Sequence, residues 1–277
     1  MKLKKIFKKI FFTLLLILTN VYIIYRIFFT IPTNLGIVSL IAAIVVLLIE
    51  IWEAFDFFIY YLNILMVKRK TPKTPSVNIS KYPDIDILIA TYNEPELLVK
   101  KTAEACLNMN YPDKSKLHIY ICDDGNRPSF KNMANDLNIG YISRLVNKNA
   151  KAGNYNHALS RISSPYVVTF DADMAPTPNF LMKSLPYFYA EENIGFIQMP
   201  QSFNNPDIYQ YRLGLGNNIP FEQDYFYHTL QIAKNETNSA VYCGTNTLFS
   251  RKALDDAGGF AYRNSFRRYC NRNVNRS

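Results

Sequence analysis

The chain has 277 residues, of which 49% are hydrophobic, and a net charge of +9 at pH 7. This apolar fraction is enough for a folded core and excludes a largely disordered chain. The basic residues gather at the N-terminus, after the second apolar segment and in the last residues, a distribution that favours membrane topology over nucleic-acid binding. Four cysteines show no metal-ligand spacing, which indicates a reduced, cytosolic location.

Two long apolar segments open the chain, at residues 7–29 and 35–65. Each could cross a hydrocarbon layer of about 30 Å as a helix, so we predict a membrane region at 1–67. A signal peptide is the alternative for the first segment, but it lacks a small-residue cleavage site and a second apolar segment follows at once. Basic residues flank the pair, and the positive-inside rule therefore places both flanks in the cytoplasm of a multi-pass protein of the inner or plasma membrane.

A Pro-, Ser- and Thr-rich segment at 68–81 predicts an exposed cytosolic linker. Beyond it, strand-like runs (DILIA, LHIYICDD and YVVTFDAD) alternate with segments of helical length. This alternation predicts βαβ units on a mostly parallel sheet, as one α/β domain at 82–260. In such sheets ligands bind beyond the carboxyl ends of the strands, which is where the polar clusters of this sequence fall.

The first two polar clusters follow the first two strand-like runs. The TYNE cluster, beginning at Thr91, is either a plain strand end before a helix or a nucleoside pocket. In the pocket, Tyr92 would face a base and Glu94 would accept from its polar edge. The CDDG cluster is either a common Asp-Gly turn or a site for ribose hydroxyls and base N–H groups. In that site we expect Asp124 to make the contact, with Asp123 beside it.

The next two clusters have the chemistry of a diphosphate site. In NAKAGNYNHAL, Gly153 at a helix start would present backbone N–H groups to an anion and Lys151 would add a charge, although a solvated helix entrance explains the pattern equally well. In VVTFDAD, the alternate spacing of Asp171 and Asp173 lets both carboxylates reach one hard cation. A divalent metal there would neutralise a diphosphate leaving group.

Two later clusters, QMPQSF and YCGTN, carry side chains able to hydrogen-bond a sugar acceptor. Gln198 belongs to the first, and Cys243 and Gly244 belong to the second. Neither cluster identifies a function alone, and Cys243 by itself is more typical of a buried structural thiol.

Taken in order, the TYNE, CDDG, KAGN, DAD, QxPQ and CGTN elements resemble the processive family-2 glycosyltransferases, and specifically the bacterial cellulose synthase catalytic subunits. The likeness covers residues 84–260 and the helices before them. It implies a GT-A fold in the cytoplasm that binds UDP-glucose with Mg²⁺ or Mn²⁺ and extends a β-linked glucan across the membrane, with possible accessory synthase subunits and no nucleic acid. An N-acetylglucosamine polymer of the chitin or hyaluronan type is the alternative product.

The resemblance also implies roles for the site residues. The uracil would lie near Tyr92 and Glu94, with the uridine also at Asp124. Lys151 would hold the diphosphate. Asp171 and Asp173 would contact the donor and its metal. The acceptor path would run past Gln198 and the Cys243-Gly244 turn.

The sequence departs from the family pattern in three places. Asn149 stands where the family loop usually opens with His, and neither the T-E-D motif that supplies the general base after Gly-Gly-Phe nor the later Q-x-x-R-W motif is present. A one-base frame slip after Phe260 would explain the tail AYRNSFRRYCNRNVNRS at 261–277, because a shifted frame can encode an E-D pair there. From these absences we expect an inactive chain that binds donor and membrane but makes no polymer, having lost a general-base contribution of about 10²–10⁴-fold.

Overall fold

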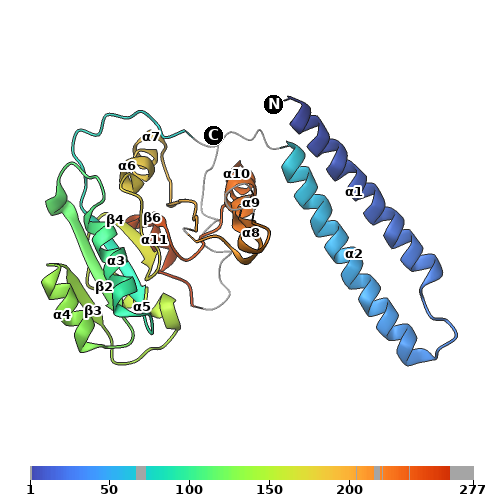
Figure 1. Ribbon diagram of the computed structural model, residues 1–277, viewed down its shortest axis with the longest axis horizontal. Coiled ribbons are helices and arrows are strands. Elements are labelled where there is room, and N and C mark those ends of the chain that lie inside the picture. Colours follow the sequence, from blue (N-terminus) through green and yellow to red (C-terminus); the bar gives the residue numbers. More distant parts are fainter. Residues whose placement is uncertain are drawn as a thin grey trace. The chain divides into compact units, whose positions relative to one another are not determined.

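The computed structural model describes residues 2–66, 73–203, 205–214, 219, 221–236 and 238–262. Most of the expected tail at 261–277 and part of the expected linker at 68–81 lie outside these residues. The chain divides into two compact units, Met1–Arg69 and Lys70–Ser277 (Figure 1).

The first unit is an antiparallel hairpin of two helices, α1 (Lys2–Phe29) and α2 (Ile37–Met66), as the apolar segments predicted. Within them, Lys9–Phe29 and Ile37–Ile59 are long and apolar enough to cross a membrane. Most of their large apolar side chains are exposed in the unit. A surface of this kind is unfavourable in water, because each square ångström of apolar area left in contact with water forgoes about 25 cal/mol.

Polar side chains join the two helices of the hairpin. Arg26 on α1 donates from Nε to Oε2 of Glu50 on α2 at 2.8 Å, and the Tyr22 hydroxyl donates to the other carboxylate oxygen at 3.0 Å. The hydroxyls of Thr13 and Tyr61 form a second cross-link at 2.7 Å. The Arg26–Glu50 ion pair and the Thr13–Tyr61 hydrogen bond join the facing helices at two levels, so they favour one register of the hairpin.

The second unit is an α/β domain built on one six-stranded sheet with the order β3-β2-β1-β4-β6-β5. Strands β1 to β4 are parallel, whereas β6 runs antiparallel to β4 and β5 antiparallel to β6. The prediction of a mostly parallel sheet is therefore confirmed, with an antiparallel edge. The strands are β1 (Ile85–Thr91), β2 (Leu117–Asp123), β3 (Gly140–Ser143), β4 (Tyr166–Asp171), β5 (Phe196–Gln198) and β6 (Thr247–Ser250).

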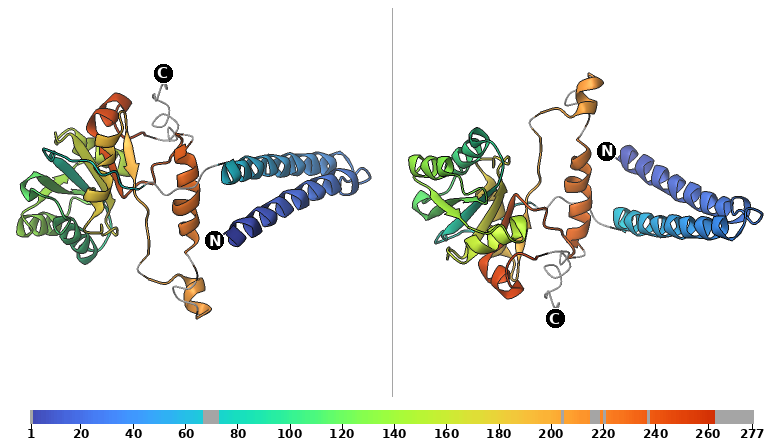
Figure 2. Two further views of the ribbon diagram at one scale, coloured as in Figure 1. Left: turned by 90° about the horizontal axis from the view of Figure 1, so that it is seen from above. Right: turned by 90° about the horizontal axis from the view of Figure 1, so that it is seen from below.

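Helices connect the strands and lie on both faces of the sheet (Figures 1 and 2). The segment between β5 and β6 leaves the sheet, forms short helices and returns (Figure 2). The helical elements are α3 (Glu96–Leu107), η1 (Lys114–Lys116), α4 (Pro128–Asp136), α5 (Ala150–Leu159), α6 (Phe180–Ser184), α7 (Tyr187–Ala190), α8 (Ile208–Arg212), α9 (Glu222–Tyr225), the π-helical turn η3 (Phe226–Leu230), α10 (Gln231–Glu236) and α11 (Arg251–Ala257).

Alternate residues of the central strands feed two separate cores. In β1, Ile85, Ile87 and Ile89 belong to a core with residues of α3 and α4, whereas Leu88 and Ala90 belong to a second core with residues of α5 and α11. This two-residue period follows from the strand geometry, in which successive side chains point to opposite faces. Because both faces are covered, β1 is buried along its whole length, and the polar residues are left at the strand ends.

Candidate active site

The candidate site lies where the parallel strands end. The strand register places Thr91 of β1 beside Asp123 of β2, and Ala90 of β1 beside Asp171 of β4. The carboxyl ends of these three strands are thus adjacent in the sheet, as the sequence predicted from its polar clusters. In an open α/β sheet this edge is where ligands bind.

At the end of β1, the TYNE residues form a closed turn. The Thr91 hydroxyl and the Tyr92 amide both donate to Oε2 of Glu94, each at 2.7 Å. Partial burial favours the neutral acid, but these hydrogen bonds outweigh it, so the pKa of Glu94 lies below its ordinary value. Glu94 is therefore an anion at neutral pH, and the Tyr92 ring beside it is exposed and open to a flat ligand.

At the end of β2, Asp123 is fully buried and bonded to the protein. Its carboxylate accepts from Arg127 Nη2 at 2.8 Å, from the backbone N–H of Gly125 at 2.9 Å and from the Tyr141 hydroxyl at 3.0 Å. The same guanidinium donates to the Thr91 hydroxyl oxygen at 2.8 Å. Arg127 thus ties the β1 and β2 ends together, and Asp123 supports this junction while its side chain makes no contact with solvent.

Asp124 is bound by a second arginine. Both of its carboxylate oxygens accept from Arg144, at 2.6 and 2.7 Å, and neither side chain is more than 8% exposed. Arg144 also donates to the backbone carbonyls of Lys148 and Ala150, at 2.7 and 2.8 Å. The Arg144 guanidinium therefore joins Asp124, the expected nucleoside contact, to the segment at the start of α5.

Helix α5 begins at Ala150, so Lys151 and Gly153 both lie in its first turn instead of in a loop before it. The cause is Asn149, whose left-handed backbone (φ 65°) ends the loop. The N–H of Gly153 donates to the Asn149 carbonyl at 3.0 Å and is not free for an anion. Gly153 is needed for space, since a Cβ there would lie 2.1 Å from the Lys148 carbonyl oxygen.

Asp171 and Asp173 follow β4 in a turn that is held from two sides. Thr102 of α3 donates to the Ala172 carbonyl at 2.7 Å, and the Asp171 amide donates to the Thr245 hydroxyl at 2.9 Å. Lys151 pairs with the Asp171 carboxylate, and both side chains are partly exposed. The structure therefore brings the predicted diphosphate lysine and the predicted metal carboxylate together.

The carboxylates of this turn fit a hard divalent cation only in part. Within the described residues no group of three or more His, Cys, Asp or Glu side chains could hold a metal ion. Asp171 is partly exposed and Asp173 is exposed, so the turn offers two carboxylates as hard oxygen ligands. This donor set suits Mg²⁺ or Mn²⁺, which take one or two carboxylates and complete their coordination with substrate phosphates and water.

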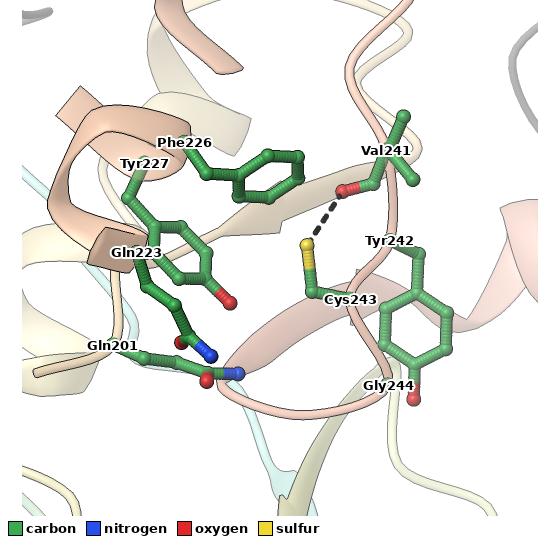
Figure 3. A pocket seen from close by; sticks show the side chains of 8 residues that line it. All are labelled: Gln201, Gln223, Phe226, Tyr227, Val241, Tyr242, Cys243 and Gly244. Atoms are coloured by element: carbon green, nitrogen blue, oxygen red, sulfur yellow. Dashed lines mark hydrogen bonds between the residues drawn. The ribbon is translucent and has the colours of Figure 1, made fainter. Parts of the chain in front are cut away.

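An open pocket of about 670 Å³ adjoins this edge, between the α9–η3 segment and residues 241–244 (Figure 3). The predicted acceptor residues Cys243 and Gly244 both line it. Figure 3 shows Cys243 facing Tyr227, while the Tyr242 ring points away from the thiol. Burial raises the pKa of Cys243, so the thiol stays neutral at pH 7 and is not a nucleophile. Gln198, the third predicted acceptor residue, bonds the backbone beneath this loop.

Arg127, Arg144 and Thr245 were not predicted from the sequence. A signal existed for the arginines, because two buried carboxylates at one strand end need cationic partners. Arg127 lies four residues after Asp123, and Arg144 follows the next strand, β3. Thr245 carried no such signal, because its contact with Asp171 crosses 74 residues of sequence.

The fold is that of a GT-A glycosyltransferase. A solved structure with a similar arrangement is the mannosyltransferase PcManGT from Pyrobaculum calidifontis, in complex with GDP-Man and Mn²⁺. The TM-score is 0.56 at 17% sequence identity, and the match covers 76% of this chain and 56% of that one. Residues 86–258 match the family described as Glycosyl transferase family 2. The chain belongs to this family.

Curated relatives within the family are bacterial cellulose synthases. Putative cellulose synthase 2 of Komagataeibacter xylinus is 36% identical over 184 residues, which are 66% of this chain and 12% of the relative. The cellulose synthase catalytic subunit (UDP-forming) of Xanthomonas axonopodis pv. citri (strain 306) is 36% identical over 180 residues, 65% of this chain and 25% of the relative. The matching part of the chain thus spans a quarter or less of the length of these two relatives.

Proposed function

We propose that the chain belongs to a membrane-bound synthase that transfers glucose from UDP-glucose to a growing β-linked glucan. The observation that carries the proposal is the Lys151–Asp171 pair at the end of β4, in a family-2 domain that is 36% identical to a UDP-forming cellulose synthase subunit. A cation and a carboxylate at this edge match a donor that brings a diphosphate and a divalent metal.

In this proposal different residues bind different parts of the donor. Tyr92 and Glu94 receive the uracil, and Asp124 receives the uridine at the end of β2. Lys151 holds the diphosphate. Asp171 and Asp173 hold Mg²⁺ or Mn²⁺, which would neutralise the negative charge that develops on the departing UDP. The acceptor sugar lies in the pocket beside Cys243 and Gly244.

The hairpin supports a membrane location for the same protein. Two helices with exposed apolar surfaces precede the family-2 domain, and lysines lie at the start of the first helix, before most of its apolar span. We propose that both helices span the membrane and that the catalytic domain faces the cytoplasm, where UDP-sugars and the growing chain would meet. Accessory subunits of a synthase complex belong to this proposal as partners.

Calorimetry on the full chain in lipid nanodiscs tests the donor site. We expect UDP to bind, Mn²⁺ to strengthen that binding, and UDP-glucose to compete better than UDP-N-acetylglucosamine. Lys151→Ala should weaken UDP binding about tenfold, whereas Lys148→Ala, at an exposed lysine nearby, should not. No UDP binding with either Mn²⁺ or Mg²⁺ would refute the proposal. If UDP-N-acetylglucosamine competes better than UDP-glucose, the transferred sugar is N-acetylglucosamine and not glucose.

A further inference from the structure

The side chain of Gln198, the last residue of β5, is engaged by the protein. Its Oε1 accepts from the Cys243 amide and from the Thr247 hydroxyl, both at 2.8 Å. Its Nε2 donates to the carbonyls of Met199 and Thr245, both at 2.9 Å. A carboxamide has two donors and one oxygen acceptor with two lone pairs, so the protein uses both donors and at least one lone pair of Gln198. The single proton of the Thr247 hydroxyl is shared between Gln198 Oε1 and the Thr245 carbonyl, which lie at the same distance from it.

The loop that Gln198 holds leads directly to the candidate donor site. Thr245 is 1% exposed, and its hydroxyl accepts from the Asp171 amide at 2.9 Å. Gly244 adopts φ +86°, and a Cβ there would lie 3.5 Å from Nζ of Lys151. A continuous series of hydrogen bonds therefore runs from Gln198 through Thr245 to the backbone of Asp171. Gly244, the residue before Thr245, lies next to the Lys151 side chain.

We propose that Gln198 and Thr245 are positioning residues that fix the Asp171 carboxylate for the metal and diphosphate of the donor. This inference rests on the proposed function and assigns Gln198 a role other than sugar contact. Thr245 acts through the Asp171 amide, and Gln198 acts through the Thr245 carbonyl. A buried network of this kind holds one geometry only while every member is bonded.

The test compares variants that differ at one hydroxyl. Thr245→Val removes the acceptor of the Asp171 N–H and keeps the shape, whereas Thr245→Ser keeps the hydroxyl. In nanodiscs, we expect Thr245→Val to reduce the Mn²⁺-dependent gain in UDP affinity about tenfold and Thr245→Ser to retain it. Uridine affinity, which reports on the β1 and β2 ends, should be unchanged in both. An equal loss for uridine and for UDP would overturn the proposal.

Gln198→Ala is the second variant, with Gln210→Ala as its matched control. Gln210 is a buried glutamine, whereas Gln198 is partly buried, and the Gln210 amide bonds backbone groups of residues 207 and 219 in the α8 region, outside this loop. Both changes should lower the Tm, because each removes a side-chain amide that is hydrogen-bonded to the backbone. Only Gln198→Ala should lower the Mn²⁺-dependent gain. An equal Mn²⁺-dependent gain in UDP affinity in the two variants would overturn the role of Gln198.

Hydrogen exchange separates this inference from the proposed function. In the nucleotide-free chain, the Asp171 amide should exchange faster in Thr245→Val than in the wild type or in Thr245→Ser. If the wild type shows no Mn²⁺-dependent UDP binding, the proposed function fails, while the exchange rates still decide whether Thr245 fixes Asp171. Unchanged exchange in Thr245→Val would overturn the positioning role in either case.

Discussion

At the residue scale, two buried carboxylates have opposite electrostatic environments. Asp123 meets the Arg127 guanidinium, so its charge is compensated. Asp86 on β1 is 2% exposed and accepts from the Ser164 amide at 2.8 Å. Burial dominates there and raises the pKa of Asp86 despite the Ser164 hydrogen bonds. The first carboxylate thus depends on a partner, whereas the second is costly to ionise.

The Asp86 environment predicts a pH-dependent effect of Asp86→Asn. A folded-state pKa above the unfolded value means that Asp86 favours folding below its unfolded pKa of about 4, an advantage lost as the pH rises through the folded pKa. Asp86→Asn should therefore raise the Tm at pH 7 relative to the wild type, and the difference should shrink towards pH 4. Thermal unfolding across this range checks it, and a pH-independent difference would contradict it.

The Asp123–Arg127 pair predicts a large cost for removing one partner. Arg127→Met should destabilise the domain by about 3–5 kcal/mol, because it leaves a buried charge without compensation. The double change with Asp123→Asn should recover part of that loss. Asp255→Asn, in an exposed pair with Arg251, should cost under about 1 kcal/mol. Urea unfolding measures all three, and a small effect of Arg127→Met would show that Asp123 is neutral in the fold.

At the scale of elements, the start of α5 is set by close approach between backbone segments. Gly153 lies in the first helical turn, where alanine normally stabilises a helix by about 1 kcal/mol. Here the Lys148 carbonyl occupies the space of a Cβ, and one nitrogen of Arg144 lies 2.5 Å from the same point. The geometry of the loop therefore outweighs helix propensity.

Gly153→Ala should consequently destabilise the domain, although alanine has the higher helix propensity. We expect a loss of stability of about 1–3 kcal/mol from overpacking, together with weaker UDP binding, because the loop lies next to Lys151. Gly195→Ala is the matched control, since the nearest atom to its added Cβ is 3.7 Å away. Chemical unfolding and UDP titration measure the two variants, and equal behaviour would mean that the loop moves aside freely.

The elements also show what the sequence could and could not predict. Short apolar runs made β1, β2 and β4 predictable, and the acidic residues at their ends indicated the edge where the candidate site lies. Gly153 was expected at a helix start and lies in the first turn of α5, but the exact first residue could not be predicted, because it depends on the left-handed conformation of Asn149. The pairing of Arg144 with Asp124 was missed although a buried carboxylate needs a cationic partner, whereas the contact of Thr245 with Asp171 left no signal because it joins segments 74 residues apart.

At the scale of the whole molecule, the hairpin predicts a topology. With both spans in the membrane, the loop between α1 and α2 faces outward and the domain that follows faces the cytoplasm. Asn34→Cys, in that loop, should react with a membrane-impermeant maleimide on intact spheroplasts, whereas Asn78→Cys should react only after lysis. A chain with Cys106, Cys122, Cys243 and Cys270 replaced by serine supplies the background, and labelling of both sites before lysis would refute the topology.

The distance in sequence between Asp171 and Thr245 also sets an order of events during synthesis. Strands β1 to β4 come from one continuous stretch, whereas the hydroxyl that holds the Asp171 amide comes 74 residues later. At a translation rate of 5–20 residues per second, about 4–15 s pass between the two residues. During that interval the nascent domain has the β1 and β2 ends that we propose bind the nucleoside, but it lacks the hydroxyl that holds Asp171, the proposed metal ligand. We therefore expect base recognition to develop before metal recognition.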